Sequence, residues 1–93
     1  MDFLELLNKV ARVARPAHHE YIPMESMDEK FENSGLDSLD VLMIVMYMAM
    51  IYDIEDEASK EIQPTTPEEL FEAISKLKRR DPESIESALG MIQ

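Results

Sequence analysis

The stretch from Val41 to Tyr52 constrains the fold of this chain most, because none of its residues carries a charge. The run is too short to cross a membrane, since a spanning helix needs about 20 residues. Just before it, Gly35 suits a left-handed turn, and Asp37 and Ser38 suit the cap of a helix. The pattern predicts a buried or partner-facing helix over about residues 38–52, with Asp37 or Ser38 as its N-cap.

Three other segments have the apolar periodicity of amphipathic helices. The first is expected to end at Pro16. A later one begins with Thr66 as N-cap, Pro67 in the first helical position and Glu69 closing a capping box. The last is expected to restart at residues 81–83. The expected buried stripes are Phe3, Leu6, Leu7, Val10, Val13 and Ala14, then Leu70, Phe71, Ile74 and Leu77, then Ile85, Ala88, Leu89 and Ile92.

The connecting segments are less regular. Residues 16–36 predict a long loop with one short helical turn near 28–32, pinned by Ile22, Met24, Met27 and Phe31. Residues 56–62 predict one or two helical turns with Ala58 and Ile62 facing inward. The chain is therefore expected to be all-α: residues 1–80 form a small antiparallel bundle of three longer helices and one short one, and residues 81–93 add a C-terminal helix.

Composition narrows the range of partners. The chain has 9 Lys and Arg against 20 Asp and Glu, a net charge of -11, which disfavours nucleic acid and anionic membranes and favours a basic protein surface. Without cysteine, it has no disulfide, thiolate metal site or thiol nucleophile. His18 and His19 lack further ligands in their polar loop, so no metal site is expected. Asp2 and Glu5 interrupt the first apolar pattern, so we expect no secretory signal. The chain is expected to be a cytoplasmic monomer without a membrane span.

The basic run at residues 76–80 is expected to form the last turn of the helix that Thr66 starts, where cations suit the negative end of its dipole. It could also pair with acids of the same chain.

The six residues 35–40, Gly-Leu-Asp-Ser-Leu-Asp, resemble the Gly-x-Asp-Ser-Leu signature of acyl carrier proteins. Residues 54–62 resemble the short third helix of that family, and Thr66 with the apolar pattern after it resembles the start of the next helix. The similarity covers roughly residues 3–78. It also accounts for the long loop after the first helix, which compact domains rarely contain.

The resemblance implies that Ser38 carries 4'-phosphopantetheine, which a phosphopantetheinyl transferase takes from coenzyme A. The thiol of that arm would hold an acyl group as a thioester. Asp37, Leu39 and Asp40 would flank the attachment site, and the two acids would be read by the transferase. A helix N-terminus favours the charge of a phosphodiester. Helices of the family can shelter an acyl chain, and the candidate lining residues are Phe31, Leu39, Leu42, Val45, Met46 and Ile62.

One departure from the family concerns the second helix. Fatty-acid carriers bear glutamates there, whereas this chain has Met43, Met46, Tyr47 and Met50. Flexible methionines suit an adaptable docking face for partner enzymes. We therefore expect a specialised carrier, or a helix that a partner or the C-terminal helix covers.

The sequence thus predicts a carrier, not itself an enzyme, that presents acyl intermediates to acyl-transferring or acyl-modifying enzymes of fatty-acid, lipid or polyketide-type synthesis. A peptidyl or aminoacyl carrier shares the serine chemistry and differs in cargo. An unmodified helical interaction module would use Ser38 only as a cap. A serine hydrolase is disfavoured, because the nucleophile elbow needs a second glycine after the serine.

Overall fold

The computed structural model describes residues 2–14 and 21–93. These residues form five α-helices, one 3-10 helix and no strand, so the predicted all-α class is confirmed. The elements are α1 (Phe3–Ala14), η1 (Phe31–Ser34), α2 (Ser38–Tyr52), α3 (Asp56–Ser59), α4 (Pro67–Leu77) and α5 (Ile85–Gly90). No helix within the described ranges is long and apolar enough to span a membrane.

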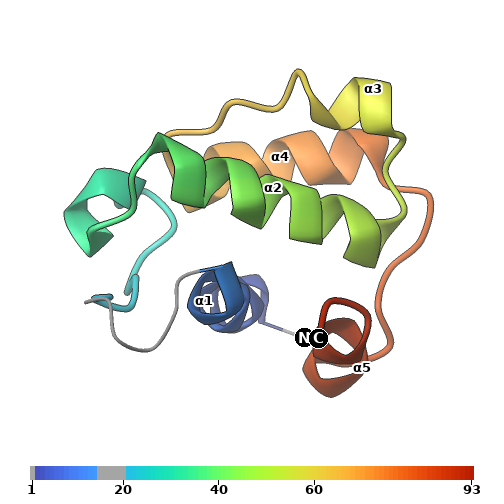
Figure 1. Cartoon of the computed structure of the whole chain (residues 1–93), viewed down its shortest axis with the longest axis horizontal. Coiled ribbons are helices and arrows are strands. Elements are labelled where there is room, and N and C mark those ends of the chain that lie inside the picture. The colour runs from blue at the N-terminus through green and yellow to red at the C-terminus, as the bar shows by residue number, and fades with distance from the viewer. Residues whose placement is uncertain (1, 15–20) are drawn as a thin grey trace.

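Helix α2 lies at the centre of the bundle and contacts α1, α3 and α4. In Figure 1 it runs in front of α4, with α3 above and α1, seen almost end-on, below. Helix α5 packs against α1. One cluster of buried side chains joins the helices and includes Leu6, Leu7 and Val10 of α1, Ile44, Met48 and Ile51 of α2, Leu70 and Ile74 of α4, and Ala88 of α5.

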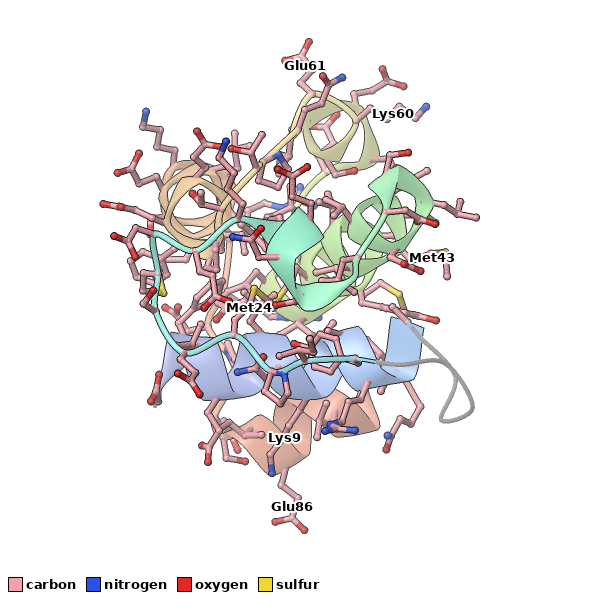
Figure 2. The ribbon with its side chains drawn as sticks, turned by 90° about the vertical axis from the view of Figure 1, so that its left-hand side faces the viewer. Lys9, Met24, Met43, Lys60, Glu61 and Glu86 are labelled. Atoms are coloured by element: carbon pink, nitrogen blue, oxygen red, sulfur yellow. The ribbon has the colours of Figure 1, made fainter. Side chains whose placement is uncertain are left out.

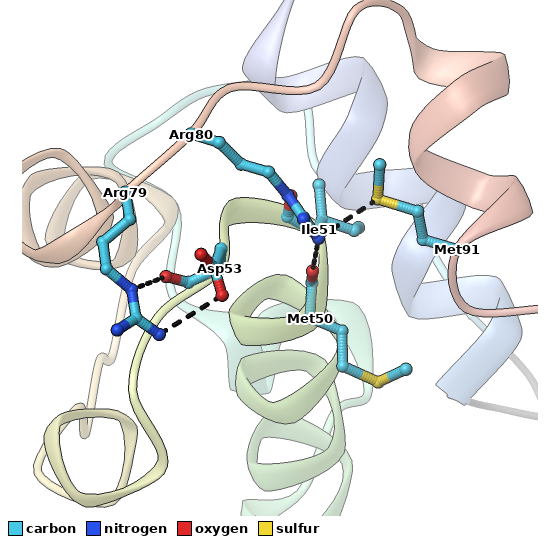
Figure 3. A network of polar contacts seen from close by, with 6 residues as sticks. All are labelled: Met50, Ile51, Asp53, Arg79, Arg80 and Met91. Atoms are coloured by element: carbon cyan, nitrogen blue, oxygen red, sulfur yellow. Dashed lines mark hydrogen bonds and ion pairs between the residues drawn. The ribbon is translucent and has the colours of Figure 1, made fainter.

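The C-terminal end of α2 is held by two arginines of the α4–α5 link, which we call the arginine clamp (Arg79 and Arg80; Figure 3). The Arg80 guanidinium donates to the carbonyl oxygens of Met50, at 2.7 Å, and of Ile51, at 3.1 Å. The Arg79 guanidinium donates to the carbonyl oxygen of Asp53, at 2.7 Å, and pairs with its carboxylate at 3.2 Å. These carbonyls have no partner within the helix, so the clamp supplies one and places cations at the negative end of the dipole.

The backbone N–H groups of Arg79 and Arg80 both donate to the carbonyl oxygen of Tyr52, at 3.1 and 3.3 Å. Helix α4 ends at Leu77, so Lys76 lies in its last turn, whereas the two arginines serve the end of α2 and not that of α4 as predicted. Arg79 also pairs with an acid of its own chain, as the sequence allowed.

Asn8 of α1 anchors the segment before η1. Its amide nitrogen donates to the carbonyl oxygen of Met24 at 3.0 Å, and its amide oxygen accepts from the N–H of Met24 at 2.8 Å. The Tyr21 hydroxyl also donates to that amide oxygen. Met24 and Phe31 are buried as predicted, but Ile22 is 61% exposed and is not an anchor. The helical turn forms at Phe31–Ser34 rather than at 28–32.

The start of α4 follows the predicted cap with one difference. The Thr66 hydroxyl accepts from the N–H of Glu69 at 3.2 Å, and Pro67 takes the first position. The Glu69 carboxylate reaches one residue further back, to the N–H and hydroxyl of Thr65, at 2.6 and 2.8 Å. These bonds lower the pKa of Glu69.

Three helix predictions were wrong in detail. Phe71 and Leu77 are exposed, because Leu70 and Ile74 alone of the expected α4 stripe point into the core. The Phe71 ring instead packs edge-on against Phe3, with centroids 4.9 Å apart. Helix α5 begins at Ile85 rather than at 81–83, because the side chain of Ser84 accepts from the N–H of Ser87 and provides the cap. Helix α3 ends at Ser59, short of the expected residue 62.

Candidate functional site

Local backbone geometry brings Ser38 to the surface. Gly35 has φ of 82°, the left-handed conformation that glycine adopts without strain, and it ends η1. Leu36 is buried and ties the turn to the core. Asp37 then caps α2, which makes Ser38 the first helical residue, and its side chain is exposed.

Asp37 and Asp40 form a reciprocal capping box around Ser38. One carboxylate oxygen of Asp37 accepts from the N–H of Asp40 at 2.9 Å, and one of Asp40 accepts from the N–H of Asp37 at 3.1 Å. The sequence predicted both acids at the helix start. It did not predict their reciprocal hydrogen bonds, because the usual capping box ends in Glu or Gln. The box fixes the direction in which α2 starts, and with it the position of Ser38.

Ser38 lines two open cavities. The first, which we call the apolar cavity, has a volume of about 610 Å³ and lies between α2 and the segment 62–65. The second, the loop cavity, has a volume of about 480 Å³ and lies on the side of η1. Ser38, Val41 and Thr65 line both. A group attached to Ser38 therefore has two recesses within reach.

The predicted acyl-chain residues divide between these cavities. Leu39, Leu42, Val45 and Ile62 line the apolar cavity, whereas Phe31 lines the loop cavity. Met46 lines neither of them. Sequence reasoning missed Val41 and the opposite wall, formed by Gln63, Pro64 and Thr65. Only the fold places that wall beside α2, and no periodic pattern marks an irregular segment as a cavity wall.

The predicted docking residues also differ in exposure. Met46 and Met50 are half exposed, while Met43 and Tyr47 are partly buried. Figure 2 shows the Met43 side chain at the outer side of α2. Two leucines that were assigned to the acyl pocket, Leu39 and Leu42, are exposed on the same helix. The outer side of α2 is thus more apolar than the docking prediction stated.

The described residues set limits on other chemistry at this site. They contain no cluster of three or more His, Asp or Glu side chains placed to hold a metal ion. His18 and His19 lie outside the described residues. Ser38 follows a 3-10 turn rather than a strand, so the strand–turn–helix elbow of a serine hydrolase is not formed here.

Burial raises the pKa of two tyrosines that line neither of the Ser38 cavities. It raises the pKa of Tyr21 to about 12, although the N–H of Met24 and the positive charge of Arg12 act in the opposite direction. The Arg12 guanidinium lies 5.5 Å from the centre of the Tyr21 ring. Burial also raises the pKa of Tyr52. Neither group lines a cavity that contains Ser38.

No protein-family model matches the chain, and no curated protein and no solved structure is significantly similar to it.

Proposed function

We propose that the protein is an acyl carrier, with 4'-phosphopantetheine attached to Ser38 and its cargo held as a thioester on that arm. One observation carries the proposal: the serine of the Asp-Ser-Leu motif is exposed at the first turn of α2 and lines an apolar cavity. A serine with only a structural role in the first turn of the helix would not need that cavity.

The residues present fit the group. The first N–H groups of a helix have no intrahelical partner and lie at the positive end of the dipole, so the start of α2 favours a phosphodiester. The side chains of Leu39, Leu42, Val45 and Ile62 offer an aliphatic lining beside the attachment point. Gln63 and Thr65 add polar groups to that lining, which suits the amides of a pantetheine arm.

The group would supply the thiol that this cysteine-free chain lacks. Ser38 would hold the arm, the capping box of Asp37 and Asp40 would orient it, and the apolar cavity would offer an aliphatic surface to a short acyl chain. The chain itself performs no chemical step in this scheme. The partners would be a phosphopantetheinyl transferase and enzymes that load, modify or unload the acyl group in the cytoplasm.

A second candidate is an unmodified interaction module. It is favoured by the exposed apolar side chains of α2, which would serve a binding partner whether or not Ser38 is modified. A peptidyl or aminoacyl carrier would share the arm and carry a more polar cargo, which the aliphatic lining favours less.

Intact-mass spectrometry separates the carrier from the module. The purified protein is incubated with coenzyme A and a broad-specificity phosphopantetheinyl transferase. The unmodified chain should gain one phosphopantetheine, and Ser38→Ala should gain none. Ser84→Ala is the matched control, because Ser84 also stands exposed at a helix start, that of α5. No gain on the wild-type chain, or a gain that persists in Ser38→Ala, would refute the proposal.

A further inference from the structure

Among the described residues that line the two cavities beside Ser38, the only cation is Lys30. It is exposed, directly precedes η1 and lines the loop cavity together with Glu32, Asp37 and Ser38. The described lining of the apolar cavity contains no charged side chain. A negatively charged group on Ser38 therefore has a cation on one side only, that of the loop cavity.

Backbone hydrogen bonds hold Lys30 in place relative to the start of α2. Its carbonyl oxygen accepts from the N–H of Asn33 at 3.0 Å. The next residue, Phe31, is buried and donates its N–H to the carbonyl oxygen of Thr65 at 3.0 Å. The carbonyl oxygen of Phe31 accepts from the N–H of Leu36 at 3.3 Å. The backbone of Lys30 is thus fixed at the cavity, and its flexible stem can bring the ammonium group to a ligand there.

The Lys30 ammonium group forms no ion pair with any carboxylate of the described residues, including the two that line the same cavity. Lys60, Lys78 and Arg79, by contrast, each pair with an acid of the chain. The charge of Lys30 is therefore available to a ligand of the loop cavity.

A phosphate on Ser38 would add negative charge between two carboxylates. Asp37 and Asp40 flank the serine in the capping box, and the chain already has a net charge of -11. A nearby cation offsets this repulsion. An exposed pair of opposite charges contributes little to the stability of a fold, so such a cation acts on the position of the phosphate.

We propose that Lys30 is a positioning residue, whose ammonium group pairs with the phosphate attached to Ser38 and holds the adjoining pantoyl group on the side of the loop cavity. The inference rests on the proposed function, which supplies the arm. Thr65 lines both cavities, so the rest of the arm can still reach the apolar cavity from there. Lys30 thereby sets the direction in which the arm leaves the protein.

The test compares proteins that a transferase has loaded to completion from coenzyme A, as checked by intact mass. Nuclear Overhauser effects from the pantoyl methyl protons report where the arm lies next to the phosphate. We expect contacts with Phe31 and Leu36, which line only the loop cavity, and not with Leu42 and Val45, which line only the apolar cavity. In Lys30→Met the contacts with the loop cavity should weaken about two- to fivefold, the effect of losing one exposed ion pair.

Two variants separate the position of the charge from its mere presence. Lys30→Arg keeps the cation and should retain the wild-type contacts. Lys60→Met is the matched control, because Lys60 is exposed and lines neither cavity, and its loss removes the same charge. It should also retain the wild-type contacts. All three variants should unfold close to the wild-type temperature, so a change in the contacts reports on the arm and not on the fold.

A chain with phosphoserine installed at position 38 tests the ion pair without the transferase. A cation beside the phosphate favours its more highly charged form. A ³¹P titration should therefore give a higher pKa for this phosphate when Lys30→Met is added, and an unchanged one when Lys60→Met is added.

Equal pantoyl contacts in the wild type and in Lys30→Met would overturn the proposal, and so would wild-type contacts confined to Leu42 and Val45. A phosphate pKa that Lys30→Met leaves unchanged would also overturn it. Loading of Ser38 with any of these results refutes the role of Lys30 and leaves the carrier function standing. If the wild-type chain gains no arm, the carrier function fails, and the phosphoserine titration alone decides whether Lys30 pairs with a phosphate on Ser38.

Discussion

Replacing Arg80 with alanine should destabilise the whole bundle, although this residue lies outside every helix. Its guanidinium donates to the carbonyl oxygens of Met50 and Ile51, at 2.7 and 3.1 Å, and so caps the end of α2. A hydrogen bond to a charged group contributes about 1.5–3 kcal/mol, and the lower part of that range applies to the solvent-exposed one of the two. Both bonds come from one exposed guanidinium, so their contributions do not add in full. We therefore expect Arg80→Ala to lower the free energy of unfolding by about 2–3 kcal/mol.

For a domain of this size, a change of 1 kcal/mol shifts Tm by about 4–8 °C, so we expect Tm to fall by about 10–20 °C. Arg80→Lys keeps the charge but lacks the planar fork, so it should lose about half as much. The backbone bond from residue 80 to the carbonyl of Tyr52 remains in both variants. The loss thus reports on the guanidinium alone.

Urea denaturation followed by far-UV circular dichroism measures the effect. Lys78→Ala is the matched control, since it removes a neighbouring cation whose pair with Asp81, at 2.7 Å, is exposed, and it should cost less than about 1 kcal/mol. The reasoning fails if Arg80→Ala costs less than about 0.5 kcal/mol, the range of ordinary surface substitutions. It also fails if Lys78→Ala costs as much as Arg80→Ala.

Two further predictions concern the anchor between α1 and the segment before η1. Asn8→Ala should lower the free energy of unfolding by about 2–3 kcal/mol, because both backbone polar groups of buried Met24 lose their partner. Asn8→Asp keeps the acceptor, so it should lower the free energy of unfolding by less in the same urea titration. The folded-state pKa of Tyr21, about 12, lies above the value of about 10 in an unfolded chain. The stability linked to Tyr21 is therefore present below about pH 10 and is lost as the pH rises towards about 12. Because the pKa of Tyr52 is also raised, titration of the phenolate absorbance should show one fewer late-ionising tyrosine in Tyr21→Phe than in the wild type. An equal late absorbance change in both proteins would contradict the assignment.

The bounds of α2 could be predicted because its determinants are local. Gly35 supplies the left-handed turn, Asp37 supplies the cap and the uncharged run fills the helix, so the predicted range of 38–52 matches the observed one. The same holds for Thr66 and Pro67 at the start of α4. Caps and turns depend on residues that lie within three or four positions of one another, so the sequence alone shows which residues interact.

Predictions of which side chains are buried were less accurate. Leu70 and Phe71 are neighbours in the sequence and both fit an apolar stripe, but only Leu70 enters the core. Likewise, Ile22 is as apolar as Met24, yet Asn8 fixes the backbone of Met24 and leaves Ile22 in solvent. Periodicity identifies an apolar face approximately, and the packing of neighbouring helices decides where that face ends.

The sequence alone therefore determined the helices and the exposed serine at the start of α2, because capping and turn formation depend on adjacent residues. Tertiary structure decided the features that require distant segments to meet. These are the wall of residues 63–65 across the apolar cavity, the arginine clamp on the end of α2, and the packing of α5 on α1. Because α5 packs on α1, the outer side of α2 beside Ser38 stays exposed, and no pattern along the chain could have determined that.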